Sequence, residues 1–229
     1  MADGVDHLSL EDHETWQDLK TYLTRAKRLD ADGAVRFVAI GEILAVYVAP
    51  LYPASLGDSA PTVLGLRTLR LAVPQHIDVV VSLAAMSDRF ARGADETSTN
   101  REKPAGIRLP LPPDRARAAW AGISPPRSGW SMIGVGDTGL LHAEAESGVR
   151  EVAEALPDQA GAQVVGSVRK AVWGAELPGV ARLPRGAAFA ASGLGFLTSS
   201  EPIALYAAGP WRRLTSARGH IIARMAAPD

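Results

Sequence analysis

One stretch of the sequence matches a motif with a known chemical role. Gly134, Gly136 and Gly139 are spaced as G-x-G-x-x-G, after an apolar run and at the start of a helical pattern. This spacing is typical of the turn that binds the pyrophosphate of a dinucleotide, because glycines let the backbone approach the phosphates. The dinucleotide-binding fold also needs a buried strand before the turn and a second strand after the helix.

The surrounding sequence does not predict that fold. The apolar run that could form the strand before the motif is only residues 130–133. After the helix, residues 157–159 lead into another helical pattern instead of a strand. We therefore interpret the glycines as a tight connection that allows positive φ, with Asp137 or Thr138 capping the helix. Free amide hydrogens at a helix N-terminus also attract anions, which is the alternative. The candidate anion-binding residues are Gly134, Gly136, Asp137, Thr138 and Gly139. We expect no cofactor.

The histidines do not predict a catalytic or metal site. His142 precedes Glu146 by four residues, so the two share a helix face, but no third ligand lies nearby in sequence. His76 and His220 have no serine or aspartate close in sequence, and there is no G-x-S-x-G motif. We predict no catalytic residue and no metal. A triad assembled only by the tertiary structure stays open.

Arginine and aromatic residues gather towards the C-terminal end. This combination is typical of surfaces that bind proteins or acidic partners. The alternative is that these side chains are simply the solvent-facing sides of strands. The candidate interaction surface consists of Trp211, Arg212, Arg213, Arg218 and His220.

The composition narrows the choice of partner and location. The chain has 229 residues, no cysteine and a formal net charge of −1. A charge this small gives no field that recruits nucleic acid or a membrane surface. We expect a protein partner or self-association and no membrane, with nucleic acid as a less favoured alternative. The first residues lack the features of a signal peptide and no apolar run could span a bilayer, so we expect a cytoplasmic protein.

A polar stretch divides the sequence. Residues 94–106 have the composition of a linker or exposed loop, which separates an N-terminal α+β unit, residues 1–93, from a C-terminal unit, residues 107–229. In the N-terminal unit a helix begins after a cap at Ser9 and is followed by a small antiparallel sheet. The expected strands are a hairpin of residues 34–40 and 43–49, then residues 62–73 and 77–82, before a helix at 83–92.

The C-terminal unit is predicted to be helical and closed by strands. Helices are expected at residues 113–121, 138–156, 163–173 and 186–192. Residues 202–207, 211–216 and 220–225 then form a three-stranded β-meander. The predicted fold class of the whole chain is α+β.

Several short motifs resemble a group of uncharacterised actinobacterial proteins. The matching residues are Trp16-x-x-Leu19, Arg25-Ala26-x-Arg28-Leu29-Asp30, Val35-Arg36, Gly65-Leu66-Arg67, and Gly209-Pro210-Trp211-x-x-Leu214 with Gly219-His220. The resemblance spans both units and implies a two-part chain in the cytoplasm. It implies no catalytic residue and no ligand.

These observations favour a non-enzymatic intracellular protein that acts through macromolecular contacts. The phosphate loops, nucleophile elbows and cysteine chemistry of common enzymes are missing from the sequence, while arginine and aromatic residues enriched in interfaces are present. The alternative is a small-molecule enzyme, or a ligand- or anion-binding domain, with a site near residues 134–139.

Overall fold

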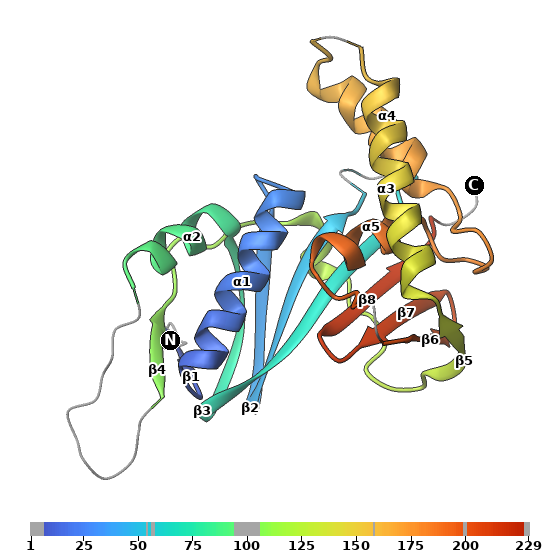
Figure 1. The fold of residues 1–229 in the computed structure, drawn as a ribbon. Helices are drawn as coiled ribbons and strands as arrows, with labels where there is room; N and C mark the ends of the chain where they lie inside the picture. The colour runs from blue at the N-terminus through green and yellow to red at the C-terminus, as the bar shows by residue number, and fades with distance from the viewer. Residues whose placement is uncertain are drawn as a thin grey trace. The chain divides into compact units, whose positions relative to one another are not determined.

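The protein is an α+β fold, which confirms the predicted fold class (Figure 1). This computed structural model describes residues 7–53, 55, 58–93, 106–157, 159–198 and 201–226. The chain forms two compact units, one made of residues 1–48 and 66–121 and the other of residues 49–65 and 122–229. Most of the predicted linker, residues 94–105, lies outside the described residues, so the predicted boundary there stays a prediction.

The first unit begins with strand β1 (His7–Leu10) and helix α1 (His13–Leu29). The predicted cap at Ser9 is wrong, because Ser9 lies in β1 and the side chain of Asp12 accepts a hydrogen bond from the Thr15 backbone N–H. One side of the helix is buried. Its buried side chains are Trp16, Leu19, Tyr22, Leu23 and Ala26.

The sheet of the first unit has the strand order β4-β1-β3-β2. Strand β2 (Ala34–Leu51) is one continuous strand, so the predicted hairpin at residues 34–49 is wrong. Gly41 takes a positive φ of 63° within the strand without reversing the chain. Strand β3 (Thr62–Ser82) likewise replaces two predicted strands with one. Both long strands contribute residues to the second unit as well.

Helix α2 (Leu83–Ala91) follows β3 as predicted, and Phe90 packs edge-on against Trp16 of α1 at a centroid distance of 5.7 Å. Strand β4 (Ile107–Pro110) then pairs with β1 at the edge of this sheet. The predicted helix at residues 113–121 is wrong. Only a short 3₁₀ turn, η1 (Ala119–Gly122), is present, because the Ala116 backbone N–H donates to the Val80 carbonyl of β3 at 2.9 Å and not to a helical partner.

The second unit contains an antiparallel sheet in the order β8-β7-β6-β5. Strands β6 (Ile203–Ala208), β7 (Trp211–Ser216) and β8 (Gly219–Arg224) confirm the predicted meander. Strand β5 (Ser131–Gly136) adds a fourth, unpredicted strand beside β6. One face of this sheet is the core face, where Leu205, Leu214 and Ile221 are buried.

Three helices accompany this sheet: α3 (Thr138–Ala155), α4 (Ala162–Gly174) and α5 (Gly186–Gly193). The side chains of Val149 on α3 and Val164 on α4 are 50% and 45% exposed. The buried positions of α3 are mostly small, such as Ala145 and Gly148, which lets helix α3 approach the Trp173 ring of α4 closely. The large apolar residues of α3 therefore do not all lie on its buried face.

Candidate interaction surface

The glycine motif does not form a turn at its first two glycines. Gly134 and Gly136 lie in strand β5, opposite Leu205 and Ile203 of β6, and neither has a positive φ. Our interpretation of these glycines as a positive-φ connection is wrong. At Gly136 the requirement is space, since an added Cβ would lie 2.9 Å from the Ile203 Cγ2 atom.

The N-terminus of helix α3 is occupied by the protein's own carboxylate. The Asp137 Oδ1 atom accepts hydrogen bonds from the backbone N–H groups of Gly139 at 2.7 Å and Leu140 at 3.1 Å, which confirms the predicted cap. An external anion at these amides would have to displace this carboxylate and would be repelled by it. The anion site stays a prediction, and the Asp137 carboxylate would compete with any anion for these amides. The predicted residues are Gly134, Gly136, Asp137, Thr138 and Gly139.

The second face of the C-terminal sheet carries the predicted arginine and aromatic residues. Trp211, Arg213 and Thr215 alternate along β7 and therefore point to the same side. Their partners in register on β8 are Arg224, Ile222 and His220, and the partner of Arg213 on β6 is Tyr206. Side chains opposite one another in a ladder share a face, so this surface spans the sheet. We call it the arginine face.

Arg213 lies at the centre of the arginine face and packs against two aromatic rings. Its Cζ atom lies 4.6 Å from the ring centroids of both Trp130 and Tyr206. The Trp130 indole N–H is held by the Pro126 carbonyl at 2.9 Å. Burial lowers the pKa of Arg213 below its usual range, with partial compensation from Tyr206, and the group stays charged at neutral pH. Its Nε atom is buried and has no acceptor among the described residues.

Most of the other predicted surface residues contact residues of the same unit. Trp211 is 6% exposed and lies under the guanidinium of Arg224 at 5.1 Å. Arg212 points to the opposite face and donates to the Ala181 and Gly209 carbonyl oxygens. His220 Nδ1 lies 3.0 Å from Thr215 Oγ1, and burial, followed by the charge of Arg213, lowers the pKa of His220.

Arg218 lies in the turn between β7 and β8 and donates its backbone N–H to Ser216 Oγ. The structure thus brings Trp211, Arg213 and His220 onto one face and places Arg212 elsewhere. Whether the predicted set acts as an interaction surface stays a prediction.

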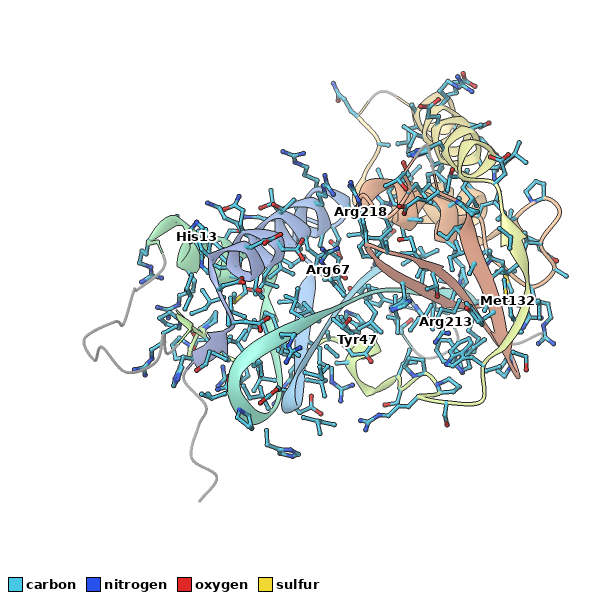
Figure 2. All side chains as sticks on the ribbon, turned by 60° about the horizontal axis from the view of Figure 1, so that its bottom comes forward. His13, Tyr47, Arg67, Met132, Arg213 and Arg218 are labelled. Carbon is cyan, nitrogen blue, oxygen red and sulfur yellow. The ribbon has the colours of Figure 1, made fainter. Side chains whose placement is uncertain are left out.

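Strand β5 forms the edge of this sheet and exposes apolar side chains. The exposed fractions are 57% for Met132, 50% for Ile133 and 60% for Val135, and Leu140 in the first turn of α3 is 68% exposed. Met132 pairs with Tyr206, so it borders the arginine face (Figure 2). A register shift between Met132 and Gly134 leaves Ile133 outside the ladder. We missed this edge because the apolar run before the glycines looked too short for a strand.

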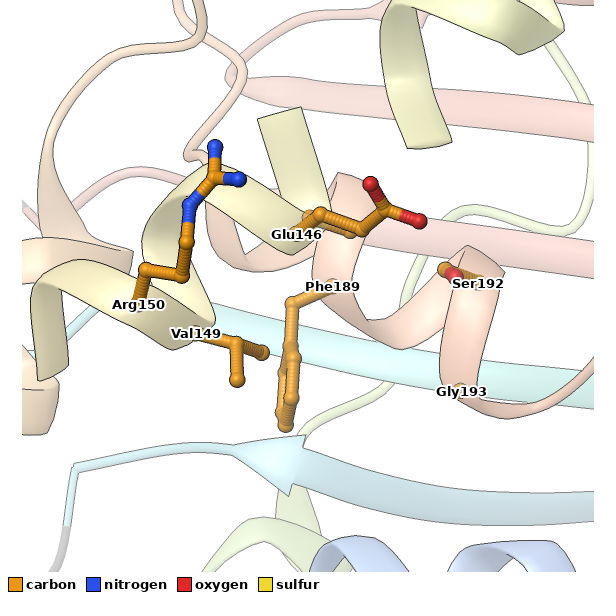
Figure 3. A pocket seen from close by; sticks show the side chains of 7 residues that line it. Glu146, Val149, Arg150, Phe189, Ser192 and Gly193 are labelled. Atoms are coloured by element: carbon orange, nitrogen blue, oxygen red, sulfur yellow. The ribbon is translucent and has the colours of Figure 1, made fainter. Parts of the chain in front are cut away.

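A separate pocket lies between helices α3 and α5. It has a volume of about 420 Å³ and is lined by Ala145, Glu146, Val149, Arg150, Phe189, Ser192 and Gly193. Figure 3 shows Phe189 and Val149 close together, with the Glu146 carboxylate and the Arg150 guanidinium pointing in different directions. Beside the pocket, His142 Nδ1 lies 3.1 Å from Ser192 Oγ. This histidine–serine pair joins two helices fifty residues apart, so sequence spacing could not show it.

No group of three or more histidine, aspartate or glutamate side chains within the described ranges has the arrangement of a metal site. The helices in those ranges also lack the combination of length and apolar character that crossing a membrane requires.

A crystal structure of a DNA polymerase sliding clamp from Pseudomonas aeruginosa, with ligand, is similar to this chain with a TM-score of 0.46 and 11% sequence identity. The match covers 93% of this chain and 63% of the clamp chain, so this protein spans less than two thirds of the clamp's length. No curated protein matches the sequence.

Two domain families match the sequence itself. Residues 4–110 match a domain of unknown function (DUF8010), and residues 125–228 match another domain of unknown function (DUF8185). These matches confirm the predicted resemblance to uncharacterised proteins: each part of the chain is similar to a domain family of unknown function.

Proposed function

We propose that this is a non-enzymatic intracellular protein that binds an extended segment of another protein along strand β5. The main support for this proposal is strand β5, which forms an open apolar edge of the C-terminal sheet. Within the described residues β5 pairs only with β6, so its outer backbone groups are available for another strand. Met132, Ile133 and Val135 on the strand are exposed at the same place. Unpaired strands with apolar side chains are sites where natural sheets accept a further strand.

The contrast with strand β4 supports this assignment. β4 also lies at the end of the strand order, but it is four residues long, contains Pro110 and exposes Arg108. Short length, proline and exposed charge are the usual ways in which an edge is protected from pairing. Strand β5 has neither proline nor charge, and its single irregularity lies between Met132 and Gly134. The segment from Gly134 to Gly136 therefore remains regular and open to pairing.

The chemistry of the edge defines the partner. A strand added to β5 must be extended so that its backbone can pair, and it must present apolar side chains to those of Met132 and Val135. Leu140 continues the apolar surface beyond the end of the strand. Together these features favour an apolar peptide segment over a folded, highly charged surface.

The test uses a photoreactive amino acid at position 132 in the full chain, expressed in its native host. We expect a crosslink to an extended segment of a partner protein. Val135→Lys, which places a charge on the edge, should abolish the crosslink. Val164→Lys is the matched control, because Val164 is 45% exposed on α4, away from β5. If Val135→Lys leaves the crosslinks unchanged while both variants stay folded, the edge is not the binding site.

The second candidate is a small-molecule enzyme or ligand-binding domain, favoured by the pocket beside the His142–Ser192 pair. Ser192 lies in the last turn of α5 instead of a strand-to-helix elbow, which makes the protein-binding role the stronger proposal. A thermal-shift screen of small molecules tests the alternative. A ligand that raises the Tm of the natural chain but not of Phe189→Ala would favour it, and no such ligand would count against it.

A further inference from the structure

We propose that Arg213 receives a carboxylate of the bound segment, so that the partner of this protein carries an acidic residue at this position. This inference rests on the proposed function and specifies the chemistry of the partner. The site consists of the Arg213 guanidinium, the rings of Trp130 and Tyr206, and the bordering Met132. Figure 2 labels Arg213 and Met132.

Several of the partly buried arginines pair with a carboxylate, whereas no carboxylate among the described residues pairs with Arg213. Arg36 pairs with Asp78 at 2.7 Å, and Arg67 pairs with Asp18. Arg185 pairs with both Glu144 at 3.3 Å and Glu151 at 2.7 Å. Among the described residues no carboxylate pairs with Arg213, and its Nε atom has no acceptor. A partly desolvated charge without a partner is costly, which makes it a strong acceptor for a matching anion.

The surroundings of Arg213 fix its orientation. Trp130 and Tyr206 pack against the guanidinium, each with its ring centroid 4.6 Å from Cζ, and the buried Nε faces protein. The Nη atoms are the part of the group left to bind a ligand. Two parallel N–H donors of a guanidinium match the two oxygens of a carboxylate. Because stacking already restricts the side chain, less rotamer freedom is lost on binding than for a mobile arginine.

The same surface is poorly suited to nucleic acid. Phosphate backbones are bound by several cations together, whereas the chain as a whole carries a net charge of −1. His220, which lies on the same face, has a lowered pKa and adds no charge at neutral pH. Arg213 packs against the Trp130 and Tyr206 rings and covers the ring face that it contacts, which leaves less ring surface for stacking bases. An oriented guanidinium beside an apolar edge fits an acidic residue within an apolar peptide.

The experiment measures binding of blocked peptides that alternate threonine and valine and carry one glutamate at successive positions. A matched set carries glutamine instead, and inorganic phosphate is a third probe. The full chain is labelled with ¹⁵N-arginine, and the Arg213 Nε–Hε signal is assigned with Arg213→Lys. We expect the best glutamate peptide to shift this signal and to bind at least about 10-fold more tightly than its glutamine counterpart.

Arg213→Lys should remove this preference while binding of the glutamine peptide remains, because lysine lacks the paired donors. Arg108→Lys, at an exposed arginine of β4 outside the arginine face, is the control and should keep the preference. Equal binding of both peptide sets, with Val135→Lys weakening both, would overturn the carboxylate site and leave strand addition intact. No binding of either set would overturn strand addition and this inference together. A shift of the Arg213 signal by phosphate with no preference for glutamate would also refute the inference.

Discussion

Replacing Gly148 with alanine should destabilise the protein, although alanine is the better helix former. Gly148 lies within α3, where exchanging glycine for alanine contributes about 1 kcal/mol of helix propensity. An added Cβ, however, would overlap Cζ3 and Cη2 of Trp173 and lie 3.2 Å from Cε3. The sign of the effect depends on whether this ring can move.

The Trp173 ring has little freedom to move. It is 3% exposed and stacks on Phe189 at a centroid distance of 4.4 Å with an interplanar angle of 22°. Forcing an extra methyl group into a packed core costs roughly 1–3 kcal/mol, and direct overlap with a buried ring favours the upper end. After subtracting the helix propensity of about 1 kcal/mol, we expect a net loss of about 2 kcal/mol in the free energy of unfolding.

The assay is urea unfolding followed by far-ultraviolet circular dichroism. Gly166→Ala is the matched control, because Gly166 lies in α4, is exposed, and has no atom within 4 Å of an added Cβ. This variant should gain about 1 kcal/mol from helix propensity alone. The packing argument is refuted if Gly148→Ala is as stable as the natural chain while Gly166→Ala shows its gain.

Three further perturbations test other parts of the structure. Asp137→Ala should lower the free energy of unfolding by about 1 kcal/mol and Asp137→Ser should restore most of it, since serine also caps a helix; urea titration compares them, and equal loss in both would contradict the cap. The pKa of His220 is lowered from 6.5 in the folded state, so the unfolded state binds the proton more readily. The free energy of unfolding should therefore be highest above pH 6.5 and should fall as the pH decreases below it. His220→Gln should flatten that fall in thermal unfolding followed across acidic pH, and an unchanged slope would contradict the assignment. Asp78→Asn should cost at most about 1 kcal/mol because the pair with Arg36 is partly exposed, and a double-mutant cycle with Arg36→Gln should give a coupling of that size, not zero.

Local patterns in the sequence predicted the elements whose partners are close in the chain. The apolar stripe of α1, with Trp16 and Leu19, gives the buried face of that helix directly, because a helix repeats every 3.6 residues. The meander of β6 to β8 is also local, since Gly209 with Pro210 and the turn at Arg218 connect strands that pair with their neighbours in sequence.

Long-range pairing decided what the sequence could not. Residues around Gly41 have the composition of a hairpin turn, yet they continue a single strand, β2, which pairs with β3. Likewise, Gly134 and Gly136 look like a turn until β6, more than sixty residues later, accepts them as a strand.

The candidate site shows the same division. The sequence by itself determined that arginine and aromatic residues gather near the C-terminal end, and it named Arg213 among them. Only the tertiary structure placed Trp130 and Tyr206 against that guanidinium, left it without a carboxylate among the described residues, and put the apolar edge of β5 beside it. A charge's partner, like a strand's neighbour, depends on which distant segments meet, and residue types along one chain do not carry that information until the chain is folded.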